Sequence, residues 1–297
     1  MRVLSVEERR AMRGHVEPLT EELGKIIYSN GQNDIFALNV DEIKELFKSS
    51  GIILFRGFEL DADKFRDFTK NFTDHFLLYY NIHRRYVGDG TQTVELFDKA
   101  IPFHGELAYL PSVTPTLRPP DIIWFYCVSH PPHSGETMTC DGIRVLSELS
   151  ESTRQLFREK RLKYKLEHIA ALWHSIAETR EQVEEILRHT EGVKGWRFDE
   201  EDTLFWEYAT FAARQTRYAD QLAFVNSIFC SRCPFEDDSA IPSNVIDELY
   251  EVTERVTVPI RWQYNDLIMI DNSRCMHGRK WHDDQRLLYV RMSLANF

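Results

Sequence analysis

The sequence predicts an α+β fold with a central β-sandwich or β-barrel and flanking helices. The chain has 297 residues, which is normal for one large β-type domain, so we expect a single domain over 1–297. Hydrophobic residues make up 43% of the chain and charged residues 28%, as in globular proteins. The expected elements run from a helical N-terminal part, about 1–39, through strands to a helical insert, about 147–200, and back to strands. This order is typical of α+β proteins.

Hydrophobic periodicity and turn residues define the elements of the N-terminal part. The predicted elements are a helix over 17–29, an amphipathic helix over 41–49, a buried strand over 51–57 and a helix that begins at Asp61. Three phenylalanines lie at helical spacing in and after the last helix, and we expect them in the core rather than around a cofactor: Phe65, Phe68 and Phe72.

The middle of the chain contains a nearly continuous run of apolar, aromatic and β-branched residues over 121–129. Such a run is typical of a strand that is buried on both faces. The elements expected after it are helices over 147–160 and 182–189, a strand-like segment over 223–226, a helix over 243–254, and strands over 266–270 and 286–294.

Composition excludes several classes of partner. The formal net charge of −11 repels phosphate backbones, so we expect no nucleic acid partner. No apolar run is long enough to span a membrane, and the N-terminus lacks the apolar core of a signal peptide. Five scattered cysteines indicate reduced thiols and a cytoplasmic protein. Cys230 and Cys233 have redox or zinc spacing, but without a second pair we interpret them as incidental thiols.

A histidine followed two residues later by an acid is one half of a possible iron site. Two histidines and one carboxylate can bind one face of iron, and residues i and i+2 of a strand share a face. The chain has four such triplets, beginning at His15, His104, His189 and His282. We expect the first and third on solvated helices and the last in a charged loop. Only His104-Gly-Glu106 has apolar flanks, although a structural histidine remains an alternative.

The third ligand of such a site would come from a distant strand. His277 follows the apolar run 266–270 and could be turned inward there. The alternative is a histidine that merely caps the end of a strand.

Five segments, taken together, resemble a known family. They appear in family order, with two short motifs after them: His104-Gly-Glu-Leu-Ala-Tyr109, Ile122-Ile-Trp-Phe-Tyr-Cys127, Ser134-Gly-Glu-Thr-Met-Thr-Cys-Asp141, Leu222-Ala-Phe-Val-Asn226 and Asp266-Leu-Ile-Met-Ile-Asp-Asn272, then His277-Gly-Arg279 and Arg286-Leu-Leu. Together they resemble the taurine dioxygenase and clavaminate-synthase-like iron(II)/2-oxoglutarate oxygenases. Weaker similarity over 52–57 extends the resemblance from about residue 40 to the C-terminus.

The resemblance implies a double-stranded β-helix, or jelly roll, with iron(II) at one mouth, 2-oxoglutarate as co-substrate and O2 as oxidant. It implies that His104, Glu106 and His277 hold the iron. It also implies that Thr137 and Arg286 bind the distal carboxylate of 2-oxoglutarate. The chemistry agrees, because a guanidinium pairs with a carboxylate through two parallel hydrogen bonds and a hydroxyl adds another.

Arg291 competes with Arg286 for the co-substrate role. Their separation of five residues puts them on opposite faces of the last strand unless a bulge intervenes. The pattern Arg286-Leu-Leu resembles relatives whose binding arginine opens that strand, so we expect Arg286 to bind. The candidate substrate contacts are Tyr109, Arg118 and Arg291.

Three departures from the family pattern leave the expected ligands in place, and one is Ser134-Gly135 in place of the usual paired glycine. The segment 114–120 looks inserted and could cover the active site or have no role. Asn265 stands where the family usually has glycine, and asparagine tolerates the left-handed conformation of a turn.

The expected function is oxidation, most simply hydroxylation, of a small polar, amino-acid-like molecule, with release of succinate and carbon dioxide. Desaturation, cyclisation or epoxidation in a biosynthetic pathway would use the same site. Glu106 argues against halogenation, because related halogenases replace the carboxylate with a small residue. Two alternatives from other classes are a zinc-dependent hydrolase and a non-catalytic jelly-roll binding protein.

Overall fold

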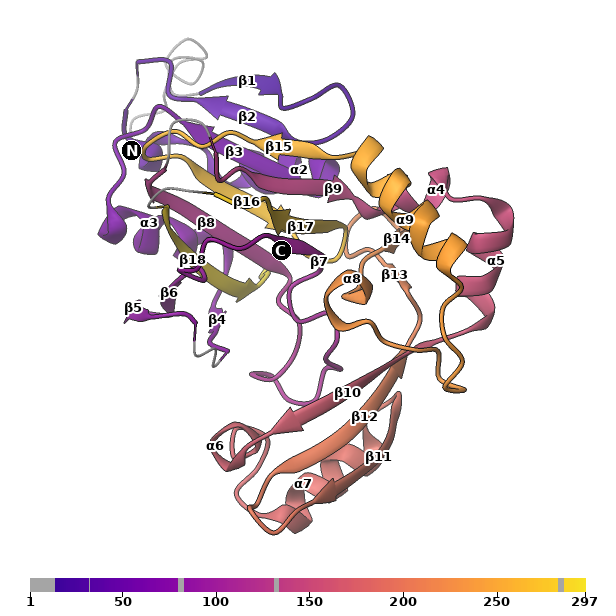
Figure 1. Cartoon of the computed structure of the whole chain (residues 1–297). Helices are drawn as coiled ribbons and strands as arrows, with labels where there is room; N and C mark the ends of the chain where they lie inside the picture. Colours follow the sequence, from indigo (N-terminus) through magenta and orange to yellow (C-terminus); the bar gives the residue numbers. More distant parts are fainter. Residues whose placement is uncertain (1–13, 32, 80–82, 131–133, 283–285) are drawn as a thin grey trace.

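The computed structural model describes residues 14–31, 33–79, 83–130, 134–282 and 286–297. Two β-sheets form the body of the molecule (Figure 1). The larger has the order β1-β2-β3-β16-β8-β18-β6-β5, with β4 also beside β18, and the smaller has the order β15-β9-β17-β7. The strands of the larger sheet are β1 (His15–Pro18), β2 (Lys25–Tyr28), β3 (Ile52–Arg56), β4 (His75–Leu77), β5 (Tyr86–Gly88), β6 (Thr91–Thr93), β8 (Ile122–Ser129), β16 (Leu267–Asp271) and β18 (Leu287–Leu294). Those of the smaller sheet are β7 (Ile101–His104), β9 (Thr137–Asp141), β15 (Val258–Ile260) and β17 (Cys275–Arg279).

The larger sheet is buried on both faces, which explains its unbroken apolar runs. Ile52 and Leu54 of β3 share a core cluster with Val258 and Ile260 of β15, so this face packs against the smaller sheet. Alternate side chains of the same strands, such as Phe55, point to the opposite face and pack against helices. The strands predicted over 51–57, 121–129, 266–270 and 286–294 are therefore confirmed in position.

The helices on the outer face of the larger sheet begin where side chains cap them. They are α2 (Val40–Ser50) and α3 (Ala62–Thr69), with the 3-10 turns η1 (Ile35–Ala37) and η2 (Lys70–Phe72). The Asp61 carboxylate accepts a hydrogen bond from the backbone N–H of Lys64 at 2.8 Å. Phe65, Phe68 and Phe72 are fully buried there, as predicted. Within the described part of the chain, no helix is long and apolar enough to cross a membrane.

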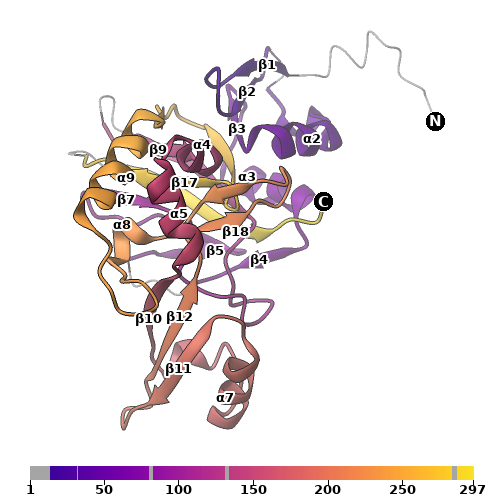
Figure 2. The ribbon, with the colours of Figure 1, turned by 90° about the vertical axis from the view of Figure 1, so that its right-hand side faces the viewer.

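A long insert separates β9 from β15, and its part over 162–210 projects away from the sheets (Figures 1 and 2). Its helices are α4 (Gly142–Glu148), α5 (Glu151–Glu159), α6 (Ala170–Trp173), α7 (Arg180–His189), α8 (Ile228–Ser231) and α9 (Ser243–Arg255). Its strands are β10 (Leu162–His168), β11 (Val193–Phe198), β12 (Leu204–Thr210), β13 (Ala213–Gln215) and β14 (Leu222–Phe224). The first three strands form an antiparallel sheet of order β10-β12-β11, which leaves β10 at one edge.

Two expectations about helices are wrong. Residues 17–29 form β1 and β2 instead of a helix, because the turn at Gly24 has a positive φ of 78° and β2 pairs in parallel with β3. The insert contains strands as well as the expected helices. The helix expected over 147–160 is two helices, since α4 ends at Glu148 and the Ser150 side chain caps α5, and β10 and β11 also lie within 147–200.

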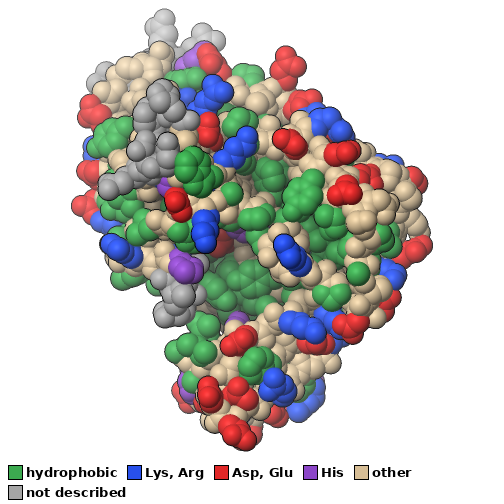
Figure 3. Space-filling model, in the orientation of Figure 1, with side chains coloured by type: hydrophobic (Ala, Val, Ile, Leu, Met, Phe, Trp, Pro, Cys, Tyr) green, Lys and Arg blue, Asp and Glu red, His purple; other side chains and the backbone are tan. Residues whose placement is uncertain are grey.

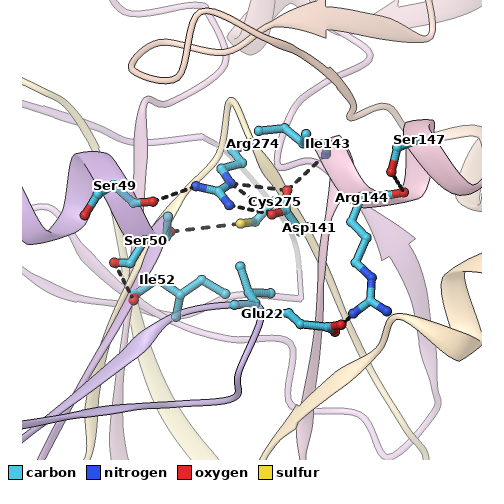
Figure 4. A network of polar contacts seen from close by, with 12 residues as sticks. Glu22, Ser49, Ser50, Ile52, Asp141, Ile143, Arg144, Ser147, Arg274 and Cys275 are labelled. Atoms are coloured by element: carbon cyan, nitrogen blue, oxygen red, sulfur yellow. Dashed lines mark hydrogen bonds and ion pairs between the residues drawn. The ribbon is translucent and has the colours of Figure 1, made fainter.

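Arg274, in the turn between β16 and β17, contacts both the residue before the insert, Asp141, and helix α2 (Figure 4). Its Nε lies 3.1 Å from Oδ2 of Asp141, and its Nη1 donates to the backbone oxygen of Ser49 at 3.0 Å. Asp141 also caps α4 by accepting from the N–H of Ile143 at 3.0 Å. The ends of β9, β17 and α2 are thereby held together.

Candidate active site

Two histidines and one glutamate converge at the end of β7. His104 of β7 and His277 of β17 are directly opposite each other in the antiparallel pair. Glu106 Oε2 lies 3.5 Å from Nε2 of His277 and 3.7 Å from Nε2 of His104. One ligand atom from each of the three residues lies within 4.8 Å of the others. The structure thus brings together the three residues that the sequence singles out.

The spacing of His104 and Glu106 predicts both residues on one strand. Glu106 lies instead in the turn that follows β7. Its backbone is fixed by Asn272, which accepts from the N–H of Glu106 at 2.8 Å and donates to its carbonyl oxygen at 3.0 Å. The turn approaches Val225 closely, because a Cβ on Gly105 would lie 2.5 Å from Cγ1 of Val225. His277 also differs from expectation, since it lies within β17 and not in a turn after a strand.

The donor set fits a divalent cation. Glu106 Oε2 is buried and has no hydrogen-bond partner among the described residues, and a buried anionic oxygen is costly unless a cation compensates it. Nδ1 of His104 lies 2.9 Å from the backbone oxygen of Pro102, which orients Nε2 toward Glu106. An ion with ligand distances of about 2.1 Å needs neighbouring donors about 3 Å apart, close to the separations seen here.

The electrostatics of the site also favour a cation. Burial disfavours the ionised form of Glu106, yet Arg84 and the two histidines hold the pKa of Glu106 well below its usual range. Burial likewise disfavours a charged His104, but Cys230 and Glu106 raise the pKa of His104 to about 10. Burial and the neighbouring His104 lower the pKa of His277. Without a metal ion, the cluster therefore retains a proton on His104.

Arg84 was not recognised from the sequence. Its Nη2 donates to Oε1 of Glu106 at 3.1 Å and its Nε donates to Oε1 of Glu95 at 2.8 Å. Arg84 thus hydrogen-bonds with one carboxylate oxygen of Glu106, and the other oxygen faces the two histidines. No motif connects residues 84, 95 and 106, so spacing gave no signal for this contact.

A small cavity lies beside the histidines and is lined by Thr137 and Arg286. Nη2 of Arg286 donates to Oγ1 of Thr137 at 2.7 Å. Burial and the nearby Arg279 lower the pKa of Arg286 to about 9. Nε of Arg286 is buried without a hydrogen-bond partner in the described part of the chain. The carboxylate of a bound dicarboxylate would supply the missing acceptor and the missing negative charge.

Of the three candidate substrate contacts, the structure places only Tyr109 at a cavity near the cluster. Its hydroxyl bonds with that of Tyr79. Arg118 pairs instead with Asp121 at 3.6 Å. Arg291 is buried and donates to Oγ1 of Thr69 at 2.6 Å. Neither arginine lines the two cavities at the cluster.

A second, larger cavity opens from the cluster toward the insert. It encloses about 1460 Å³, partly open to solvent, and Figure 3 shows a hollow between the body and the insert. Its lining includes His104 and Glu106, the nearby Arg84 and Glu95, the turn after β7, β10 and the segment 227–234. Cys230 belongs to this lining and contacts His104. Its spacing to Cys233 did not predict this position beside the cluster. Cys233 is buried. The segment 114–120 lines neither cavity.

The other three His-x-acid triplets lie elsewhere. His189 lies at the end of α7, exposed, and bonds with Glu185, as expected of a solvated helix face. His15 is exposed too, but it lies on β1 and bonds with Glu17 at 2.8 Å. His282 was expected in solvent and is instead buried, with its backbone N–H donating to the oxygen of Asp98.

Comparisons with known proteins agree with this geometry. The chain is 21% identical over 286 residues to 3-((Z)-2-isocyanoethenyl)-1H-indole synthase of Fischerella ambigua, with 93% of each chain covered. Its fold matches PvcB of Pseudomonas aeruginosa, an iron and α-ketoglutarate dependent oxygenase from an isonitrile synthetic pathway, with a TM-score of 0.63, 15% identity and coverage of 99% of this chain and 94% of that one. It also matches a putative α-ketoglutarate-dependent taurine dioxygenase of Burkholderia xenovorans, with a TM-score of 0.63, 15% identity and coverage of 95% and 93%.

The family comparison covers nearly the whole chain. The profile of the family described as taurine catabolism dioxygenase TauD, TfdA matches residues 15–292. Enzymes of this class use iron(II), 2-oxoglutarate and O2. The chain is therefore a member of the TauD/TfdA family of iron(II)- and 2-oxoglutarate-dependent dioxygenases.

Proposed function

We propose that the protein oxidises a small polar, amino-acid-like molecule at the His104, Glu106 and His277 cluster, with release of succinate and carbon dioxide. The observation that carries the proposal is the buried Arg286 guanidinium, which bonds to Thr137 and shares a small cavity with both histidines. A dicarboxylate anchored there would lie with its other end at the cluster. The two sheets are inferred to be the halves of a double-stranded β-helix within one domain over 1–297.

Each group has a defined task in this proposal. His104, Glu106 and His277 would hold the ion, and the bound ion would supply binding of co-substrate and O2. Arg286 and Thr137 bind and orient the distal carboxylate, while Phe125 limits water in the same cavity. Bound iron and 2-oxoglutarate supply the activation of O2, coupled to decarboxylation. The five cysteines are free thiols, which supports a cytoplasmic location.

A second outcome at the same site is desaturation in a biosynthetic pathway. It is supported by two similar proteins whose names refer to isonitrile chemistry, the Fischerella synthase and PvcB. Cyclisation and epoxidation use the same groups. The outcomes differ in the product, because hydroxylation adds one oxygen atom whereas desaturation removes two hydrogen atoms.

The test is a screen of amino-acid-like compounds with iron(II), 2-oxoglutarate and O2, in which succinate is measured against the rate without added compound. We expect one compound class to raise succinate formation and to yield an oxidised product by mass spectrometry. The Arg286→Ala variant should lose this response at moderate 2-oxoglutarate concentration. Substrate-stimulated turnover that is unchanged in this variant would refute the proposed co-substrate pocket.

A further inference from the structure

The edge of strand β10 borders the larger cavity. Six consecutive residues, Lys163–His168, line this cavity together with His104 and Glu106. Side chains alternate between the two faces of a strand, so consecutive residues line one cavity when the edge of the strand faces it. β10 pairs with β12 on one side only, and its other side is the sheet edge.

Among the described residues, the backbone N–H and C=O groups on this edge have no hydrogen-bond partner after Lys163. The N–H of Lys163 donates to the oxygen of Pro234 at 2.9 Å, so it points away from β12. In an antiparallel ladder every second residue points the same way, which places the N–H and C=O of Lys165 and the N–H of Glu167 on the same edge. Within the described residues, these three groups have no hydrogen-bond partner.

Four side chains of β10 are buried or paired. Tyr164, Leu166 and His168 are buried, and the first two belong to the core cluster of the insert. Nζ of Lys163 pairs with Asp238 at 2.6 Å. Along this wall, the backbone groups of β10 that are unpaired among the described residues lie beside the exposed side chains of Lys165 and Glu167.

We propose that the substrate carries an extended chain of amide groups that adds to β10 as a further strand. This inference rests on the proposed function and specifies its substrate class, a short peptide-like amide and not a free amino acid. Exposed sheet edges bind extended peptides through their main-chain groups. The cavity continues from the edge to His104 and Glu106, so the reacting end of a chain bound there lies at the cluster.

The test compares Lys165→Pro with Lys165→Ala as reference. Both variants lack the lysine side chain, but only proline lacks the N–H and places its ring at the edge. Proline is tolerated there because this N–H does not pair with β12. Probes are dipeptides with an N-acetyl group and a C-terminal amide, each compared with the corresponding free amino acids. Succinate formation above the rate without probe gives KM.

We expect the capped dipeptides to stimulate succinate formation more than the free amino acids do. KM for the best dipeptide should be about tenfold higher in Lys165→Pro than in Lys165→Ala. Glu167→Pro provides a second variant of the same edge if Lys165→Pro does not fold. Equal KM values in the proline and alanine variants, equal stimulation by free amino acids, or no stimulation by any dipeptide would overturn the inference.

Failure of this inference is distinguishable from failure of the proposed function. If only the inference fails, the protein still binds iron and 2-oxoglutarate and forms succinate slowly without probe. If the proposed function fails, that binding and that slow succinate formation are absent as well.

Discussion

At Glu106 the two carboxylate oxygens have different surroundings. Arg84 donates to Oε1, while Oε2 faces the two imidazoles and has no hydrogen-bond partner among the described residues. In Arg84→Met the buried carboxylate of Glu106 loses its compensating charge, so we expect the metal-free protein to lose about 3 kcal/mol of unfolding free energy. A bound divalent ion compensates the same charge, and it should restore much of that loss.

Thermal unfolding with and without Co(II) measures this effect. The midpoint should rise more on addition of Co(II) in Arg84→Met than in the wild type. Arg291→Met is the control, because this other buried arginine contacts Thr69 and lies outside both cavities. Equal Co(II) effects in Arg84→Met and wild type would show that Arg84 does not compensate Glu106.

The pair Arg286 and Arg291 tests the co-substrate pocket. Only Arg286 lies beside Thr137 in the small cavity. Loss of a charge-assisted pair should cost ~1.5–3 kcal/mol, or about one to two decades in 2-oxoglutarate affinity, in Arg286→Ala. Arg291→Ala should keep that affinity and lose stability instead. Titration of the iron-loaded variants with 2-oxoglutarate measures this affinity. A loss of affinity confined to Arg291→Ala would show that Arg291, and not Arg286, binds 2-oxoglutarate.

Metal binding should depend on pH because a proton competes for the cluster. The pKa of His104 in the metal-free protein is raised to about 10, chiefly by Cys230 and Glu106 acting against burial. Below that pH the ion must displace a proton from the imidazole, so apparent affinity should rise with pH by up to about tenfold per unit. Metal titrations between about pH 6 and 9 check this. An apparent metal affinity that does not change with pH would contradict a protonated His104 in the metal-free protein.

At the scale of elements, the turn after β7 sets the position of Glu106. A Cβ on Gly105 would lie 2.5 Å from Cγ1 of Val225 and 3.0 Å from Cβ of Ala108. Gly105→Ala must therefore displace the turn, and we expect metal affinity to fall about tenfold or more. Adding Val225→Ala removes the nearer clash and should recover part of the affinity. Wild-type affinity in the single variant would show that the turn tolerates displacement.

The sequence predicted elements whose signals are local. The N-cap at Asp61 and the apolar run over 122–129 lie where expected, and Asn265 has the left-handed φ, 68°, expected in place of glycine. Residues 17–29 were misassigned because β2 is fixed by pairing with β3, a contact that periodicity does not encode. The Arg84 contact likewise depends on distant chain segments coming together.

At the scale of the whole molecule, the cluster lies between the β-sheet body and the insert. The small cavity belongs to the body, and the larger one is shared with β10 and the segment 227–234 of the insert. Family motifs identified the cluster and the co-substrate side, because those residues lie in short segments. The insert has no such motif, so the position of β10 beside the cluster could not be predicted from sequence. Membership of the TauD/TfdA family favours the oxygenase over the zinc hydrolase and the binding protein.

The most direct test of the proposed metal site is an anaerobic titration of the metal-free protein with iron(II) and then 2-oxoglutarate, followed by visible charge-transfer absorption. The proposed cluster of His104, Glu106 and His277 predicts one iron per chain and an absorption band that appears only when both components are present. The band should be absent in His104→Ala and in His277→Ala. A wild-type band with full iron content in either variant would contradict the assignment of the metal site.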